Sequence, residues 1–216
     1  MHHLKRQPFR MAGHDILLDL PADPDALLAS ATDVDADCDP YWGILWDAAV
    51  PTAECVLQST WADGLRVLEI GCGAGLVGLA GLLAGMDVTF SDMVPDAVQL
   101  AEHNAALNGF PNTAGIVMDW NDAKHDSFDM ILASDVLYET RHHAALLTLL
   151  KRSLHRQGRC WIGDPGRQQA VPFIQAAIDN GWSVQLSDRN LQPIDAPVLA
   201  TFQLIALTRT VTGEPE

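Results

Sequence analysis

The 216-residue sequence is short of basic residues, has only four cysteines and contains no long apolar run. Its 13 lysines and arginines face 28 aspartates and glutamates, which gives a formal net charge of −15. Binding to a phosphate backbone depends on clustered Lys and Arg, so we expect no nucleic-acid partner. The acidity is compatible with a basic protein partner, although it can equally serve solubility alone.

The cysteines and the apolar stretches narrow the possibilities further. The cysteines form no Cys-x-x-Cys pair and have no histidine at metal-ligand spacing; they are Cys38, Cys55, Cys72 and Cys160. We therefore expect reduced thiols, no metal and a cytoplasmic location. No apolar run reaches the ~18 residues of a membrane span, and the start MHHLKRQPFRMAGHD lacks the apolar core of a signal peptide. We expect no membrane association.

What the chain does contain is an alternation of strand and helix patterns. Buried strands are expected at 66–70, 87–91, 114–118, 128–133 and 159–164, separated by helical patterns. Two late strands, about 182–188 and 199–207, have no helix between them. This order predicts a doubly wound α/β fold with a Rossmann-like, seven-stranded sheet and an antiparallel hairpin at its edge. The length suits one domain over 1–216, and with no evident apolar stripe we expect a monomer.

A glycine-rich turn follows the first of these strands, in VLEIGCGAG. Gly71, Gly73 and Gly75 allow positive φ angles and close approach of a ligand to the backbone. The spacing departs from the dinucleotide fingerprint, because Leu76 stands where a third Gly or Ala is required. Glu69 would repel a pyrophosphate, whereas its carboxylate suits a ligand that carries an ammonium and a sulfonium, as S-adenosylmethionine does. A tightly packed turn without a ligand is the alternative.

Polar or aromatic residues also end the next two strands. Asp92 lies 21 residues after Gly71, where a carboxylate can accept hydrogen bonds from both hydroxyls of a ribose; it would equally well cap the following helix. Asp119 and Trp120 end the third strand, where indole can stack on adenine and the Asp can meet the exocyclic amine. The Trp would alternatively cover the core. Three such sites at consecutive strand ends favour S-adenosylmethionine binding.

These residues resemble a known family. VLEIGCGAGLVGLAGLLAGMDVTFSD is similar to the first two motifs of class I methyltransferases, particularly the methyltransferase family 16 group of protein-lysine methyltransferases. MDW and ASDVLYE resemble that group's later motifs, and DPYWGILWDAA resembles its N-terminal segment, in which a Trp borders the cofactor. IGDPGR resembles the branch that methylates the electron-transfer flavoprotein β subunit. Residues 47–49 depart from that branch, since they read Asp-Ala-Ala where it tends to have Pro-Gly-Gly.

The resemblance implies a set of site residues and an arrangement around them. The expected cofactor contacts are Trp46, Glu69, Gly71, Cys72, Gly73, Gly75, Asp92, Met93, Asp119, Trp120 and Ser134. Residues 1–45 are expected to form an N-terminal extension that covers the cofactor and substrate cleft, although 1–38 match little in the family. S-adenosylhomocysteine would be the product, and a protein that presents a lysine would be the partner.

The stretch SDVLYET after the fourth strand carries the expected catalytic pair, Asp135 and Tyr138. A lysine with a pKa of ~10.4 is only about 0.1% neutral near pH 7.4, so the site must align and desolvate the neutral amine. Asp135 would orient that amine, and Tyr138 would form an aromatic wall. The resemblance assigns this Asp-x-x-Tyr loop to the acceptor, which agrees; simple capping of the strand is the alternative.

Other residues and other functions stay open. Asp164 and Arg167 could shape the acceptor rim or belong to a plain Pro-Gly turn, while His142 and His143 are read as a solvated helix face rather than cleft residues. Trp42 is expected to pack or to form the rim. The rival functions are a small-molecule or nucleobase N-methyltransferase, a non-catalytic cofactor-binding protein and a nicotinamide dehydrogenase. Asp-Val-Leu-Tyr in place of Asn-Pro-Pro-Tyr or Asp-Pro-Pro-Tyr disfavours the nucleobase enzymes.

Overall fold

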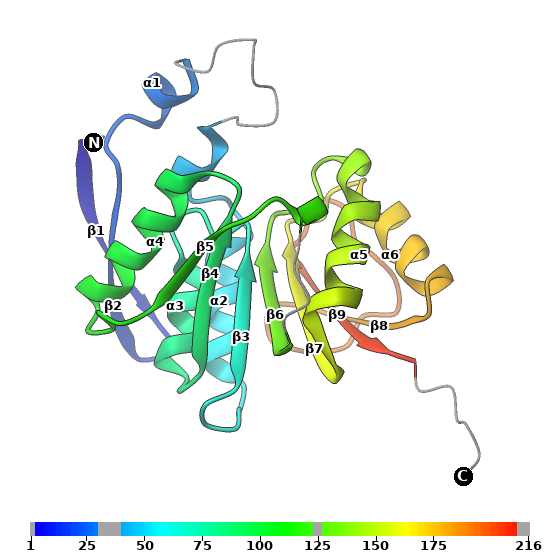
Figure 1. The fold of residues 1–216 in the computed structure, drawn as a ribbon. Coiled ribbons are helices and arrows are strands. Elements are labelled where there is room, and N and C mark those ends of the chain that lie inside the picture. Colours follow the sequence, from blue (N-terminus) through cyan, green and yellow to red (C-terminus); the bar gives the residue numbers. More distant parts are fainter. Residues whose placement is uncertain (1–2, 30–39, 123–126, 211–216) are drawn as a thin grey trace.

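A central sheet of seven strands organises the computed structural model, which describes residues 3–29, 40–122 and 127–210 (Figure 1). The strand order is β5-β4-β3-β6-β7-β9-β8, and β9 runs antiparallel to both of its neighbours while the other pairs are parallel. The predicted fold, with its antiparallel edge, is confirmed. The strands are β3 (Arg66–Ile70), β4 (Asp87–Asp92), β5 (Ala114–Val117), β6 (Phe128–Ser134), β7 (Leu154–Asp164), β8 (Trp182–Ser187) and β9 (Gln203–Arg209).

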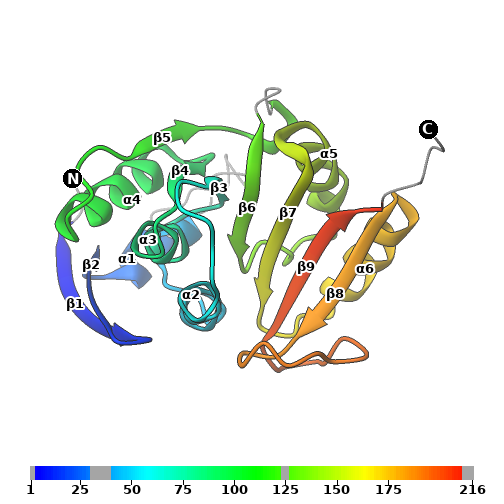
Figure 2. The same ribbon diagram turned by 90° about the horizontal axis from the view of Figure 1, so that it is seen from below.

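Helices cover both faces of this sheet because its central strands are apolar on both sides. On β3, Val67 packs into the cluster beneath α2, α3 and α4, whereas Leu68 and Ile70 pack into the cluster beneath α5 and α6. Figures 1 and 2 show these two helix layers on opposite sides of the sheet. The helices are α1 (Pro24–Ala29), α2 (Ala49–Gln58), α3 (Leu76–Leu83), α4 (Pro95–Leu107), α5 (His143–Ser153) and α6 (Ala170–Asp179).

The N-terminal region contains elements that the sequence patterns did not reveal. Strands β1 (Leu4–Met11) and β2 (His14–Pro21) form a separate antiparallel hairpin, which lies against α4 at the outer side of the molecule (Figure 1). Helix α2, which comes after α1 in the chain, packs on α3. It also approaches β7 so closely that a Cβ on Gly163 would fall 1.7 Å from the Thr52 hydroxyl.

Two strands begin at other residues than expected. β7 begins at Leu154 rather than Arg159, with an irregular register opposite Phe128 and Met130. β9 begins at Gln203 rather than at 199, because Ala200 has a φ of 54° and donates its N–H to Gly166 O (2.8 Å) instead of to a strand. This ties the β8–β9 loop to the turn after β7.

The structure also bears on the membrane spans and the cysteines considered in the sequence. In the three described stretches, no helix has the length and apolar character needed to cross a bilayer. Cys55, Cys72 and Cys160 are buried free thiols, while Cys38 lies outside the described residues.

Candidate active site

The candidate site lies at the C-terminal ends of β4, β3 and β6, where the strand order reverses between β3 and β6. Ligands of open α/β sheets bind at such a point. Every residue that we assigned to the cofactor or to catalysis lines one cleft here, from Trp46 and the glycine turn to Ser134, Asp135 and Tyr138. The structure thus brings all of them together, and their contacts with a ligand remain predictions. These thirteen residues are Trp46, Glu69, Gly71, Cys72, Gly73, Gly75, Asp92, Met93, Asp119, Trp120, Ser134, Asp135 and Tyr138.

The glycine turn needs its glycines for packing as well as for backbone angles. Gly71, Gly73 and Gly75 have φ angles of 59°, 48° and 79°. A Cβ on Gly75 would sit 2.7 Å from that of Ala101 on α4, and one on Gly73 would sit 3.1 Å from Trp42 O. The turn is therefore held between α4 and the N-terminal segment, with its backbone along the cleft.

Asp92 is fixed by the backbone around it. Its Oδ2 accepts a hydrogen bond from Gly73 N (3.1 Å) and its Oδ1 accepts one from Val94 N (3.0 Å). The second contact matches the alternative role at the start of α4, although the helix is not capped by a side chain. Burial raises the pKa of this carboxyl, against those two backbone hydrogen bonds and one from Met93. A carboxylate has four lone-pair sites, so one stays available for a hydroxyl group in the cleft beside these three backbone contacts.

Glu69 is a buried carboxylate without a full set of partners. It lies on β3 beneath α3, is 2% exposed, and its Oε2 makes no hydrogen bond within the described residues. Its pKa is raised to about 8, mainly by burial and also by the nearby Asp92, while hydrogen bonds from the Gly78 and Val77 backbone oppose the rise. Because an anion in this position lacks a counter-charge, a cation in the cleft would stabilise it.

Asp135 stands at the end of β6 in an unusual backbone conformation. Its φ is +60°, a region that few non-glycine residues adopt, and its N–H bonds Gly163 O at 2.8 Å. The side chain is 2% exposed and pairs through Oδ1 with Arg167 Nε at 2.6 Å, whereas Oδ2 is buried without a hydrogen-bond partner in the described part of the chain. Burial raises the pKa of this carboxyl and Arg167 opposes that effect.

Three partly exposed aromatic rings line the same cleft as Asp135. Tyr41 meets Trp46 edge to face at 5.7 Å between ring centroids and Tyr138 at 6.3 Å. The Trp46 indole donates to Tyr41 O at 3.0 Å, which fixes its orientation. Tyr138 is 42% exposed, so its ring can face a bound side chain. Tyr41 is a cleft residue that our sequence reasoning did not assign.

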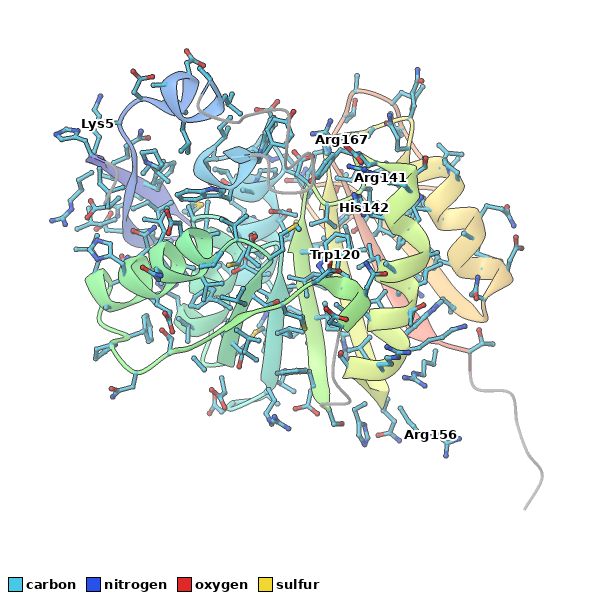
Figure 3. The ribbon with its side chains drawn as sticks, turned by 45° about the horizontal axis from the view of Figure 1, so that its top comes forward. Lys5, Trp120, Arg141, His142, Arg156 and Arg167 are labelled. Atoms are coloured by element: carbon cyan, nitrogen blue, oxygen red, sulfur yellow. The ribbon has the colours of Figure 1, made fainter. Side chains whose placement is uncertain are left out.

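The other end of the cleft is formed by η2 (Trp120–Asp122) and η3 (Thr140–His142). Trp120 meets the ring of His142 edge to face at 6.2 Å, while Asp119 Oδ1 accepts from Asn121 N and Nδ2. Glu139 pairs with Arg141 and, at 3.4 Å, with His142. Figure 3 shows Arg141, His142 and Arg167 at the end of the sheet where the cleft lies, and Arg156 at the opposite end of the sheet.

Several residues that we left open now have places. His142 lines the cleft, and His143 is buried against Phe173, so the expectation of a solvated histidine pair was wrong. Trp42 also lines the cleft, together with Ile44 and Leu45. The apolar and aromatic residues of the stretch PYWGILW were the sequence signal from which these cleft residues could have been predicted. The described residues before Tyr41, including the β1–β2 hairpin, do not line the cleft.

The donor set fits S-adenosylmethionine. Glu69 offers a buried carboxylate whose Oε2 has no partner among the described residues to a positively charged head, and the glycine turn offers backbone that lines the cleft. Asp92 and Trp120 stand at the neighbouring strand ends for a ribose and a purine. No cluster of three His, Cys, Asp or Glu suited to a metal ion occurs within residues 3–29, 40–122 and 127–210.

The chain is similar in sequence to known methyltransferases. The chain is 33% identical over 126 residues to histidine protein methyltransferase 1 homolog of Dictyostelium discoideum, covering 55% of this chain and 41% of that protein. It is 31% identical over 134 residues to the electron transfer flavoprotein beta subunit lysine methyltransferase of Danio rerio, covering 61% and 52%. The chain thus spans about half the length of these relatives.

A solved structure shares the fold. Magnesium protoporphyrin IX methyltransferase from Synechocystis, crystallised with bound S-adenosylmethionine, superimposes with a TM-score of 0.57 at 17% identity, over 75% of this chain and 78% of that one. At this identity the likeness concerns the Rossmann-like class I methyltransferase fold alone. The sequence model of a family described as lysine methyltransferase matches residues 34–175, more than half of the chain. The chain therefore belongs to the lysine methyltransferase family.

Proposed function

We propose that this protein transfers a methyl group from S-adenosylmethionine to a side-chain nitrogen of a protein, with lysine as the acceptor. The observation that carries the proposal is the shared cleft: the glycine turn and Glu69 lie in one hollow with Asp135 and Tyr138. Family membership and the lysine-methylating relative from Danio rerio support the same activity.

The chain's own residues would align and desolvate the acceptor. Oδ2 of Asp135 has no partner among the described side chains and can accept a hydrogen bond from the amine. The exposed ring of Tyr138 can pack against the aliphatic stem and its charge. Bound S-adenosylmethionine supplies a methyl group whose bond to sulfur breaks as the N–CH3 bond forms, leaving S-adenosylhomocysteine. The proton of the acceptor ammonium leaves through water, since a lysine must be neutral to attack.

Histidine is the second candidate acceptor. The relative from Dictyostelium discoideum is named as a histidine protein methyltransferase and is 33% identical to this chain. An imidazole is largely neutral at physiological pH, so it makes less demand on the site for deprotonation. The same cleft residues would serve, with Asp135 accepting from the ring N–H that is not methylated.

The test is transfer of isotope-labelled methyl groups from S-adenosylmethionine into a cell extract that is then separated into proteins, nucleic acids and small molecules. We expect label in a few protein bands, recovered as methyllysine after hydrolysis. Asp135→Ala should lower transfer at least tenfold, or about 1.4 kcal/mol, while cofactor affinity persists. Methylhistidine would select the second candidate.

Other outcomes would contradict the proposal. Label confined to small molecules would indicate a small-amine enzyme, and tight cofactor binding without any transfer would indicate a non-catalytic binder. A variant Asp135→Ala with unchanged transfer would remove this residue from the mechanism. Asp195→Ala is a suitable control, because Asp195 is an acidic loop residue that does not line the cleft.

A further inference from the structure

Arg167 projects from a turn whose position is set by hydrogen bonds. Oδ1 of the buried Asp164 accepts the backbone N–H groups of Gly166 and Arg167, each at 2.8 Å. Gly166 has a φ of 89°, and a Cβ there would fall 2.4 Å from Thr201 N in the β8–β9 loop. The starting point of the Arg167 side chain is therefore well defined.

From this turn the guanidinium reaches the carboxylate at the end of the neighbouring strand. Arg167 Nε lies 2.6 Å and Nη2 2.5 Å from the same oxygen, Oδ1 of Asp135. Both donors use one oxygen, so Oδ2 is left without a hydrogen-bond partner among the described residues. Arg167 does not itself line the cleft, whereas Asp135 does. The arginine thus holds Asp135 from outside the cleft.

The electrostatic balance at Asp135 depends on this contact. Burial raises the pKa of the carboxyl, and Asp164 raises it further, while Arg167 and the backbone amide of Ala48 at the start of α2 lower it. Within the described part of the chain Arg167 is the cation paired with Asp135, so its removal would favour the protonated, uncharged form. The pair as it stands has little net charge, which lessens the tendency of a lone carboxylate to hold a lysine as ammonium.

We propose that Arg167 is a positioning residue for methyl transfer, which holds Oδ1 of Asp135 so that Oδ2 stays ionised and available to the acceptor nitrogen. This inference rests on the proposed function, because it assigns a role within that reaction. It also accounts for the Asp-Pro-Gly-Arg turn, because the buried Asp164 fixes the turn and the turn in turn directs the arginine toward Asp135.

The test compares Arg167→Gln and Arg167→Lys with the wild type, measuring kcat/KM across pH 6–10 on one protein acceptor and the affinity for S-adenosylmethionine. We expect Arg167→Gln to lower kcat/KM at least tenfold at pH 7 and to move the acidic limb to higher pH. Cofactor affinity should stay within about twofold, and Arg167→Lys should restore much of the rate and the original limb. Arg189→Gln is the matched control, since Arg189 pairs with Glu54 on the surface.

A readout without turnover separates this inference from the proposed function. The titration of Asp135, followed by carbon-13 NMR of labelled aspartate, should move to higher pH in Arg167→Gln. An unshifted acidic limb with activity like that of the control would overturn the positioning role. Equal losses of stability, cofactor affinity and rate would show a purely structural role instead. If the wild type methylates nothing while the titration shifts as expected, the proposed function fails and the pairing alone stands.

Discussion

Glu69 illustrates how a single buried residue can serve binding at a cost to the free protein. The carboxylate lies under α3, where a Cβ on Gly78 would approach its Oε2 to 2.5 Å. Burial raises its pKa to about 8 from an ordinary 4.5. Between these two values the folded protein binds more protons than the unfolded chain does, so the free energy of unfolding falls as pH rises. A bound cation would remove that penalty by stabilising the anion.

At the scale of the residue we therefore predict that Glu69→Gln stabilises the ligand-free protein in a pH-dependent way. The free energy of unfolding of the variant, minus that of the wild type, should be smallest near pH 5 and grow by roughly 1.4 kcal/mol per unit until it levels near pH 8. Urea denaturation at pH 5, 6.5, 8 and 9 measures this difference. Affinity for S-adenosylmethionine should fall at the same time. A difference independent of pH would show that the pKa of Glu69 in the folded protein is close to its value in the unfolded chain.

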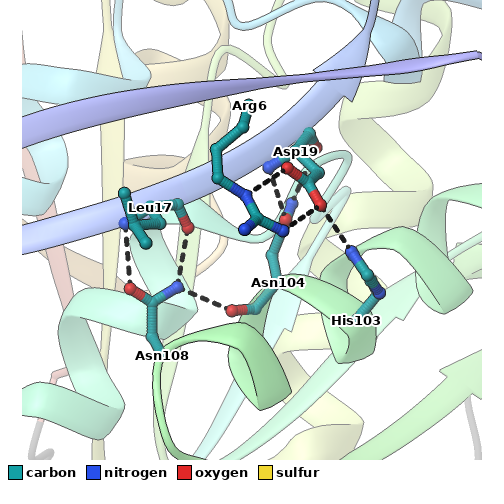
Figure 4. A network of polar contacts seen from close by, with 6 residues as sticks. All are labelled: Arg6, Leu17, Asp19, His103, Asn104 and Asn108. Atoms are coloured by element: carbon teal, nitrogen blue, oxygen red, sulfur yellow. Dashed lines mark hydrogen bonds and ion pairs between the residues drawn. The ribbon is translucent and has the colours of Figure 1, made fainter.

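At the scale of elements, α4 connects the N-terminal hairpin to the glycine turn. Figure 4 shows the contacts of α4 with the hairpin. Asn104 is fully buried: its Oδ1 accepts from Asp19 N at 2.8 Å, and its Nδ2 donates to Asp19 O and to Ala74 O at 3.2 and 2.9 Å. Asn108, one turn later, bonds the backbone N–H and C=O of Leu17. Asp19 also pairs with Arg6 and His103, and the Arg6 contact is the largest cause of its pKa of about 2.

The two asparagines allow a matched experiment on these elements. Asn104→Ala leaves three backbone groups without partners, and we expect a loss of about 2–4 kcal/mol in the free energy of unfolding. Because Ala74 belongs to the glycine turn and lines the cleft, cofactor affinity should fall several-fold as well. Asn108→Ala should destabilise the protein by about 1–3 kcal/mol and leave the affinity unchanged. Urea denaturation and titration calorimetry provide both quantities; equal affinities in the two variants would disprove the link to the turn.

Elements with a clear apolar pattern could be predicted from the sequence. Others could not, because polar residues or a proline obscured their pattern. β3 was placed at 66–70, as observed, because RVLEI is apolar on both faces. β1 was missed because half of LKRQPFRM is polar and the stretch carries a proline, although Ile16, Leu18 and Leu20 alternate clearly on β2. Pro51 in the first turn obscured α2. A proline is tolerated there, since the first N–H groups of a helix have no partner within it.

The candidate site, too, could be predicted only in part from the sequence. The cleft residues at the strand ends could be assigned because parallel strands bring their C-terminal ends together, so position in the sequence implies position in space. Trp46, which precedes the sheet, was assigned from the family resemblance alone. The pairing of Asp135 with Arg167 could not, because it joins residues 32 positions apart and depends on side-chain directions. Neither could the open Oε2 of Glu69, since no sequence pattern records which polar atoms lack partners.

At the scale of the whole molecule, the cleft depends on the fold of most of the chain. Its lining runs from Tyr41 to Ala145 and joins the N-terminal segment, four strand ends and the start of α5. The unfolded chain cannot assemble such a site, so a ligand of the cleft binds the native state alone and stabilises it by mass action. Thermal stability is therefore a sensitive measure of which cofactor this protein takes.

We accordingly expect S-adenosylmethionine and S-adenosylhomocysteine to raise the melting temperature, and nicotinamide dinucleotides to leave it unchanged. At a concentration of 100 Kd the gain is ~2.7 kcal/mol, which for a domain of this size corresponds to roughly 5–10 °C. Asp92→Ala should melt without this shift, because it removes the carboxylate that anchors Gly73 N and faces the cleft. Scanning calorimetry with each ligand gives the answer. A shift with NADH and none with S-adenosylmethionine would restore the dehydrogenase as the better explanation of the glycine turn.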